Sequence, residues 1–321
     1  MMLPNLEALR SAADVIHRVM PPTPQISWPL LCERTETEVW VKHENHTPLG
    51  AFKVRGGILY LQELIRAQPK VSGVITATRG NHGQSIAFAA RRAGIRALVV
   101  VPHGNSIEKN AAMRALGATL IEHGEDFQEA YEHAATLVEA QGLHFVRSFN
   151  ETIVRGVASY ALELFDAVRE LDAVYVPIGQ GSGICGTIAA RNALGLKTEI
   201  IGVVAEGAPA YALSAAAGRP VSSGVVATIA DGMACRVPDP TALKIILAGT
   251  SRLVVVADAQ IRAAMRHLFT DTHNAAEGAG AAALAALLKE NARIKGRRVA
   301  IVQSGGNVDH DLFAQVLGES A

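Results

Sequence analysis

The chain has 321 residues, of which 49% are hydrophobic, so it is long enough to bury one large or two medium-sized cores. Its 30 basic and 30 acidic residues give no net charge, which argues against the basic surface of a protein that binds nucleic acid or an anionic membrane. We therefore expect a small-molecule partner.

Short runs rich in valine and isoleucine alternate with alanine-rich runs along most of the chain. The former predict buried parallel strands, because they are short and do not alternate in polarity, and the latter predict helices. The predicted strands are 71–78, 97–102, 119–122, 173–178, 199–205, 253–256 and 298–302, and the predicted helices are 84–93, 108–116, 127–140, 157–168, 186–193, 259–270 and 279–290. This order indicates an α/β fold of open parallel sheets with helices on both faces.

Two sheet domains are expected rather than one. Segment 67–147 contains its own β/α units and would form a small domain, inserted between 1–66 and 148–321, which together would form the large domain. Residues 207–224 are rich in alanine, glycine, proline and serine, and are expected to form a loop region.

The first candidate for chemistry is Lys53, which lies between Phe52 and Arg55 in a segment bounded by glycines, 50–57. An isolated lysine of this kind is usually a solvated cation at a helix start. Three further junctions between apolar runs and helix-like runs, 78–83, 179–186 and 304–307, favour a single assembled site that contains it.

Residues Gly179, Gln180, Gly181, Ser182 and Gly183 follow a predicted strand and precede a predicted helix. Backbone amides at such a turn can bind a phosphate, although a tight turn that needs glycine is the alternative. The loop is not a P-loop, because no Gly-Lys-Ser/Thr follows it.

The dinucleotide fingerprint is met only out of register, by Gly181, Gly183 and Gly186. Glu206 lies near the spacing of a ribose-binding acid, so a nicotinamide-dependent oxidoreductase stays open as a competitor.

The segment Thr78, Arg79, Gly80, Asn81 and His82 has the same strand-to-helix pattern. Its amides and the Thr78 hydroxyl would suit a carboxylate, and Asn81 is a candidate donor to a ring hydroxyl. His82 is more typical of a helix start or a core, and we assign it no proton transfer.

Taken together, segments 51–56, 80–82, 179–182, 228–232 and 304–307 resemble the fold type II pyridoxal phosphate enzymes, in the branch of the serine and threonine dehydratases and serine racemase. The resemblance covers nearly the whole chain in the correct order. It implies pyridoxal 5'-phosphate as cofactor, an amino-acid substrate and a homodimer.

The resemblance also implies roles for matched residues. Lys53 would hold the cofactor as a Schiff base and act as the base at Cα. The 179–183 loop would bind the cofactor phosphate, Asn81 the ring hydroxyl and Ser304 the pyridine nitrogen, while 78–82 would bind substrate. A neutral partner such as Ser304 favours elimination of a β-hydroxyl over transamination.

The chain departs from the family pattern at several positions. Ala51 replaces the usual serine, and Gln180 and Ser182 replace glycines. Arg79 replaces the serine that serves as acid or base in serine racemase-like members, which disfavours racemisation because arginine stays protonated. Arg79 has two open interpretations: it recognises an acidic β-substituent, or it points outward, either to solvent or to an ion pair at a domain edge.

No metal site is expected. Glu206 matches the first carboxylate of the cation site of some members, but the second position falls near Ala212, which cannot ligate. The three cysteines, Cys32, Cys185 and Cys235, match neither a zinc site nor a disulfide framework. They indicate a cytoplasmic protein, and no segment is apolar enough to span a membrane.

The sequence thus predicts a dehydratase, or ammonia-lyase, that converts L-threonine or L-serine to a 2-oxo acid and ammonia. A phenylserine or 3-hydroxyaspartate dehydratase is the main alternative. An amino-acid racemase and a non-catalytic protein that binds the cofactor or a metabolite are further ones.

Overall fold

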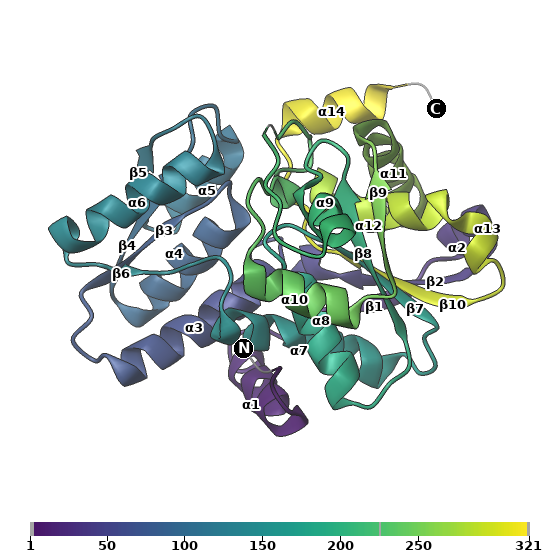
Figure 1. Cartoon of the computed structure of the whole chain (residues 1–321), viewed down its shortest axis with the longest axis horizontal. Helices are drawn as coiled ribbons and strands as arrows, with labels where there is room; N and C mark the ends of the chain where they lie inside the picture. The colour runs from purple at the N-terminus through teal and green to yellow at the C-terminus, as the bar shows by residue number, and fades with distance from the viewer. Residues whose placement is uncertain (1–2, 225, 320–321) are drawn as a thin grey trace.

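The computed structural model describes residues 3–224 and 226–319, so the outermost residues of the predicted large domain, 1–2 and 320–321, lie outside it, as does 225. The chain forms two sheets that lie side by side (Figure 1), one of six strands and one of four. Both carry helices on each face, which confirms the predicted α/β fold class.

The larger sheet has the strand order β1-β2-β10-β7-β8-β9. Every neighbouring pair is parallel except β1 and β2, which are antiparallel. Its strands are β1 (Gln25–Ser27), β2 (Glu38–His43), β7 (Ala173–Pro177), β8 (Glu199–Ala205), β9 (Arg252–Val256) and β10 (Arg298–Gln303).

The smaller sheet has the order β5-β4-β3-β6, and all its pairs are parallel. Its strands are β3 (Gly73–Ala77), β4 (Arg96–Val101), β5 (Thr119–Glu122) and β6 (His144–Phe145). The residue boundaries proposed above for a large and a small domain stay a prediction.

Each sheet separates the hydrophobic core into two layers, one on each face, and helices cover both layers. Along β7, Val174 and Val176 pack toward α7 and α8, whereas Ala173 and Tyr175 pack toward α11 and α12. The helices are α1 (Leu6–His17), α2 (Pro29–Thr35), α3 (Lys53–Ala67), α4 (Asn81–Ala93), α5 (Ile107–Ala115), α6 (Phe127–Gln141), α7 (Glu151–Ala167), α8 (Ser182–Ala193), α9 (Ala210–Ala217), α10 (Pro240–Gly249), α11 (Asp258–Thr272), α12 (Gly278–Lys289), α13 (Asn291–Ile294) and α14 (His310–Gly318), with 3-10 turns η1 (Glu44–His46) and η2 (Asp231–Met233).

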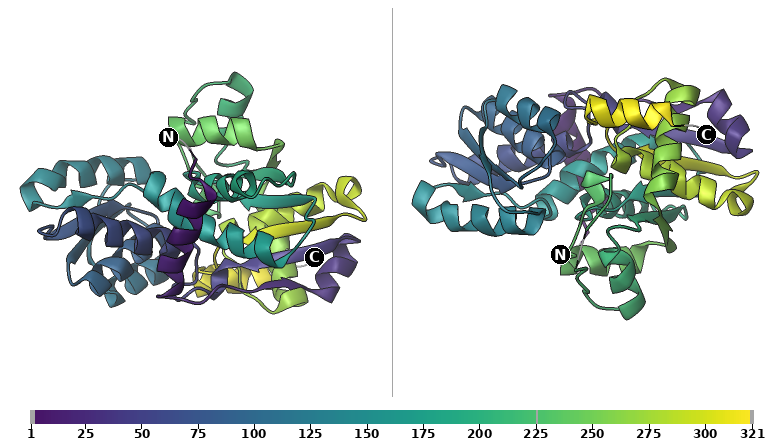
Figure 2. Two further views of the ribbon diagram at one scale, coloured as in Figure 1. Left: turned by 90° about the horizontal axis from the view of Figure 1, so that it is seen from below. Right: turned by 90° about the horizontal axis from the view of Figure 1, so that it is seen from above.

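Helix α3 packs against both α4 and α7, so it joins the two sheet units from below in the view of Figure 1, as the turned views of Figure 2 also show. Two glycines permit the close packing. A Cβ at Gly57 would lie 2.2 Å from the Ser85 hydroxyl, and one at Gly56 would lie 3.0 Å from Ile153. The helix that begins at Lys53 is therefore clamped between the two units.

The expectation of a loop over 207–224 is wrong, because α9 occupies its middle. The run from Ala210 to Ala217 consists largely of alanine, which has the highest helix propensity. Pro209 precedes it, and Gly218, with φ of 65°, ends it in the left-handed conformation typical of a helix C-terminus. Proline and glycine here mark the ends of a helix rather than a continuous loop.

Within residues 3–224 and 226–319, no helix combines the length and apolar character that crossing a membrane would require.

Candidate active site

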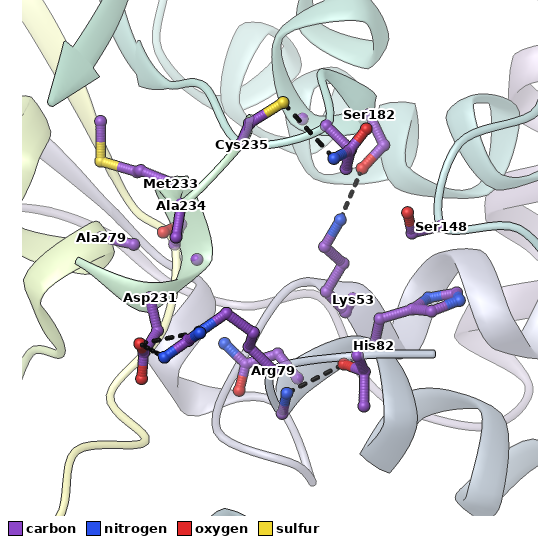
Figure 3. A pocket seen from close by; sticks show the side chains of 18 of the residues that line it. Lys53, Arg79, His82, Ser148, Ser182, Asp231, Met233, Ala234, Cys235 and Ala279 are labelled. Carbon is purple, nitrogen blue, oxygen red and sulfur yellow. Dashed lines mark hydrogen bonds and ion pairs between the residues drawn. The ribbon is translucent and has the colours of Figure 1, made fainter. Parts of the chain in front are cut away.

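A cavity opens between the two sheet units, at the carboxyl ends of strands β3, β7 and β10. All twelve residues predicted for the site contribute to its lining. They are Lys53, Thr78, Arg79, Gly80, Asn81, His82, Gly179, Gln180, Gly181, Ser182, Gly183 and Ser304. Figure 3 labels Lys53, Arg79, His82 and Ser182 among them. Parallel strands end at a common edge, which explains why junctions far apart in sequence meet here.

Lys53 enters the cavity from the first residue of α3. The residues before Lys53 pair with those that follow strand β10. Ala51 forms an antiparallel β-bridge with Gly305, and the Phe52 amide donates to the Ser304 carbonyl over 3.1 Å. The Lys53 amino group donates to the Ser182 hydroxyl over 2.9 Å. Burial lowers the pKa of Lys53 to about 8, against an opposing attraction from Glu277.

The loop Gly179 to Ser182 is folded so closely that it leaves no room for side chains at its glycines. A Cβ at Gly179 would lie 2.0 Å from the Gly232 carbonyl oxygen, and Gly181 has φ of 98° just before α8 begins. The loop residues and the first two residues of this twelve-residue helix line the cavity. Such a helix start attracts an anion.

The loop from Thr78 to His82 is shaped by the Thr78 hydroxyl, which accepts hydrogen bonds from the amides of Gly80, 2.9 Å, and Gly83, 3.2 Å. This hydroxyl is thus engaged in holding its own loop. The amides of Asn81 and His82 lie in the first turn of α4, where no intrahelical acceptor is available to them. They remain suited to an anionic ligand.

The Asn81 side chain is held at both ends. Its amide nitrogen donates to Glu277 over 2.6 Å, and its amide oxygen accepts from Asn307 over 2.9 Å. One N–H of Asn81 remains to meet a ligand. Glu277, which directly precedes α12, also forms an ion pair of 3.0 Å with Lys109 of α5.

Arg79 forms an ion pair with Asp231 of η2, with 3.0 Å between its Nη2 and the carboxylate. Of the two interpretations left open by the sequence, this arrangement is the ion pair between sheet units. Lys109 lies 3.7 Å from the other oxygen of Asp231. Each carboxylate of the cavity wall is therefore matched by a cation, as Figure 3 shows for Arg79 and Asp231.

The other titratable groups of the wall are held in one form near neutral pH. Burial, and after it the charge of Lys53, lowers the pKa of His82 to about 3, so the ring is neutral. Burial raises the pKa of Cys235 to about 12, so its thiol stays protonated. Lys53 is the one lining group of the described residues whose shifted pKa lies near the physiological range.

Several lining residues were not singled out from the sequence, namely Lys109, Phe127, Ser148, Met233, Cys235 and Glu277. Asp231 lies in the segment 228–232 that carried the family resemblance, but no role was assigned to it. Lys109 lies inside a helix-like run without glycine, and Glu277 precedes Gly278 at a helix start that does not follow an apolar strand-like run. In the part of the chain that the structure describes, no three histidine, cysteine or acidic residues are grouped to hold a metal ion.

Comparison with known proteins identifies the class. A family model described as "Pyridoxal-phosphate dependent enzyme" matches residues 16–305, and the chain belongs to this family. The L-threonine ammonia-lyase of Thermotoga maritima is 33% identical over 98% of this chain and 77% of the relative. A biosynthetic L-threonine dehydratase of Salmonella typhimurium is 35% identical over 89% of the chain, which spans only 56% of that relative. The structure of maize serine racemase superposes with a TM-score of 0.91 at 27% identity, covering 98% and 97% of the two chains. The predicted family and the predicted cofactor are confirmed.

The residues present fit pyridoxal phosphate. The 179–182 cradle offers amides and a helix N-terminus where a Cβ would fill the space, and the Lys53 amine lies within 2.9 Å of that cradle at Ser182. His82 also lines the cavity, and its buried Nε2 has no hydrogen-bond partner among the described residues. A bound group with polar edges would meet an unpaired nitrogen there.

Proposed function

We propose that this protein is a dehydratase of a β-hydroxy amino acid, with L-threonine or L-serine as substrate and a 2-oxo acid and ammonia as products. The observation that carries the proposal is the position of Lys53, a buried amine with its pKa lowered to about 8, beside an anion-binding loop. An amine with this pKa can act as a base near neutral pH. The names of the threonine ammonia-lyase and threonine dehydratase relatives support the same activity.

The chain's residues divide the work of the reaction. Loop 179–183 would hold the cofactor phosphate, Ser304 and Asn81 the ring edges, and the first-turn amides of α4 the substrate carboxylate. When bound, pyridoxal phosphate supplies an electron sink that stabilises negative charge at Cα. Lys53 would first be bonded to the cofactor and, once displaced by the substrate amine, would take the Cα proton.

Loss of that proton would let the Cβ–O bond break, and the hydroxyl would leave as water by taking up the proton that Lys53 carries. The released enamine tautomerises to an imine, which water hydrolyses to the 2-oxo acid and ammonia. Exclusion of water from the cavity favours the elimination. Lys109 and Glu277, which pair in the cavity wall, are almost fully buried.

The ion pairs among the charged residues of the cavity wall disfavour the racemase alternative. Racemisation needs a second acid that returns a proton to the other face of Cα. Here Asp231 is paired with Arg79, Glu277 with Lys109, and His82 and Cys235 stay neutral. An acidic β-substituent is likewise less favoured than a neutral one, because the Arg79 charge is already matched.

The test is a coupled 2-oxo acid assay of the cofactor-loaded protein with threonine, serine, phenylserine and both 3-hydroxyaspartate diastereomers. Turnover of threonine or serine above the others supports the proposal. A preference for phenylserine or 3-hydroxyaspartate would keep the reaction and change the substrate. A protein that binds the cofactor but releases ammonia from none of them would refute the dehydratase.

We further propose a homodimer that works in the cytoplasm. All three cysteines, Cys32, Cys185 and Cys235, are free thiols, which suits a reducing compartment. Size-exclusion chromatography with light scattering measures the assembly, and a mass of one chain would refute the dimer.

A further inference from the structure

Lys109 is a buried lysine in the cavity wall for which the proposed reaction has no use. Its side chain is 7% exposed, and its amino group lies 3.0 Å from Glu277 and 3.7 Å from Asp231. Burial alone would lower the pKa of Lys109, but attraction from these two carboxylates outweighs it and raises the pKa. The lysine is thus held as a cation at the junction of the two sheet units.

The loop beneath Lys109 is shaped to admit it. Gly80, with φ of +151°, has no side chain, and a Cβ there would lie 2.3 Å from Lys109 Cδ. The lysine stem therefore crosses directly over the loop that precedes α4. The backbone of Lys109 is also held, because it lies in the first turn of α5. Ser106 caps this end of the helix: its hydroxyl accepts from the Lys109 amide over 3.1 Å and donates to Asp309.

Glu277 connects this lysine to the reacting groups. One of its oxygens pairs with Lys109, and the other accepts from Asn81, which is bound in turn to Asn307. A Cβ at Gly305 would lie 2.6 Å from Glu277 Oε1, so the carboxylate also packs against the loop that carries Ser304. One buried charge thus touches both loops proposed to hold the cofactor ring.

A buried carboxylate without a partner is costly, by several kcal/mol, and takes up a proton instead. Without Lys109, Glu277 would lose its ion-pair partner and be left with Asn81 as its hydrogen-bond partner, so the carboxylate would no longer be held in its present position. The charge of Glu277 is the one attraction that opposes the effect of burial on Lys53. The groups facing Lys53 are Glu277, the neutral ring of His82 and the Ser182 hydroxyl.

We propose that Lys109 is a positioning residue, which through its ion pair with Glu277 holds that carboxylate in place, fixes Asn81 and sets the charge environment of Lys53. The inference deepens the proposed function but concerns the cofactor-free chain as well. It assigns a role in setting the working pH to a residue that contacts neither the Lys53 amine nor the loop proposed for the phosphate.

The test uses full-length Lys109→Met protein without cofactor. The rate at which its amine reacts with added pyridoxal phosphate, followed by absorbance, is measured across pH, because only the neutral amine of Lys53 attacks the aldehyde. A Glu277 carboxylate that is no longer held in place attracts Lys53 less and lowers the pKa of Lys53, so the rise of rate with pH should move about one unit lower than in the unmodified protein. An unmoved profile would overturn the proposal.

Three companion variants separate charge from packing. Lys109→Arg keeps the cation and should keep the profile, whereas Glu277→Gln removes the anion directly and should shift it as Lys109→Met does. Glu277→Gln decides the question even if Lys109→Met does not fold. Lys244→Met, on the exposed face of α10, is the matched control and should change nothing.

In the loaded enzyme, Lys109→Met should lower kcat/KM about tenfold or more and shift its acid limb in the same direction, with Lys109→Arg restoring both. Loss of activity with unshifted profiles in both assays would show a merely structural lysine. Since the cofactor-free assay needs no amino-acid substrate, its result stands even if the dehydratase proposal fails.

Discussion

The ion cluster behind Lys53 gives a quantitative test of what holds the base in place. Arg55, in the first turn of α3, is fully buried and donates to both oxygens of Glu44, at 2.7 and 2.9 Å, and to both oxygens of Glu163, at 2.6 and 2.9 Å. Lys42 adds a second buried cation 2.6 Å from Glu163. Two cations thus face two carboxylates in the interior.

Replacing Arg55 by Met removes one cation and leaves Glu44 buried without its partner. Breaking a buried pair in this way costs about 3–5 kcal/mol, because the remaining charge has lost its compensation. We expect this loss in the free energy of unfolding at pH 7, measured by urea denaturation of the cofactor-free protein. Since Arg55 and Lys53 share one helical turn, the covalent capture of cofactor by Lys53 should fall with it.

Arg10→Met is the matched control. Arg10 pairs with Asp166 over 3.1 Å, but the two side chains are 52% and 42% exposed. Such a surface pair contributes at most about 1 kcal/mol. If Arg55→Met were as mild as Arg10→Met, the argument that the buried cluster fixes the start of α3 would be refuted.

The same cluster has a pH signature. Burial alone would raise the pKa of Glu163, but attraction and hydrogen bonds from Arg55 and Lys42 lower it to about 2. A carboxyl whose folded pKa lies below its unfolded value of about 4.3 stabilises the fold above that value, and this contribution is lost as pH falls toward 2. The difference between Arg55→Met and the unmodified protein should therefore shrink between about pH 4 and pH 2.

Three further changes test the site. Lys53→Ala should lower 2-oxo acid formation about 10³-fold or more, because the base is removed; activity near that of the unmodified protein would exclude the assigned role. Gly179→Ala would bring its Cβ to 2.0 Å from the Gly232 oxygen, so the loop must shift. Fluorescence titration should then show cofactor binding weakened about tenfold or more. Unchanged binding would count against this loop as the phosphate site. Arg79→Ser should leave Asp231 without its short ion pair and allow slow racemisation of serine, measured by chiral chromatography; the absence of the other enantiomer would show that more than this pair suppresses it.

The central strands and half of the α-helices of the fold were predictable because their signals are local. All seven predicted strands are present, with ends within two residues, since buried parallel strands are short apolar runs between glycine-containing turns. The strands that escaped prediction are β1, β2 and β6. Strands β6 and β1 have only two and three residues, and β2 interrupts its apolar residues with the polar residues Glu38, Lys42 and His43.

Helix α3 was missed for a different physical reason. Gly56 and Gly57 lower its helix propensity, so the sequence near Lys53 does not read as a helix. The structure requires both glycines, because their bare backbone lets Ser85 of α4 and Ile153 of α7 approach. Tertiary packing here outweighs the local preference, and it does so at the helix that carries the candidate base.

The same distinction applies to the site. Each predicted loop is a local pattern, a strand followed by glycine and a helix, and topology brings such loops to one edge. The pairings of Lys109 with Glu277 and of Arg79 with Asp231 join residues far apart in sequence. No periodicity or spacing encodes such a partner, so the charges that surround Lys53 were beyond prediction from one sequence.

These pairings decide which chemistry the cavity favours. Among its described lining residues, three cations, Lys53, Arg79 and Lys109, face two carboxylates, Asp231 and Glu277. The excess positive charge suits a phosphate and a substrate carboxylate, while Arg79 and Lys109 are engaged in ion pairs with Asp231 and Glu277. Under the proposed function, Lys53 would be the group that moves a proton at Cα, and a single base without an opposing acid would favour departure of the β-hydroxyl over return of the proton to the other face.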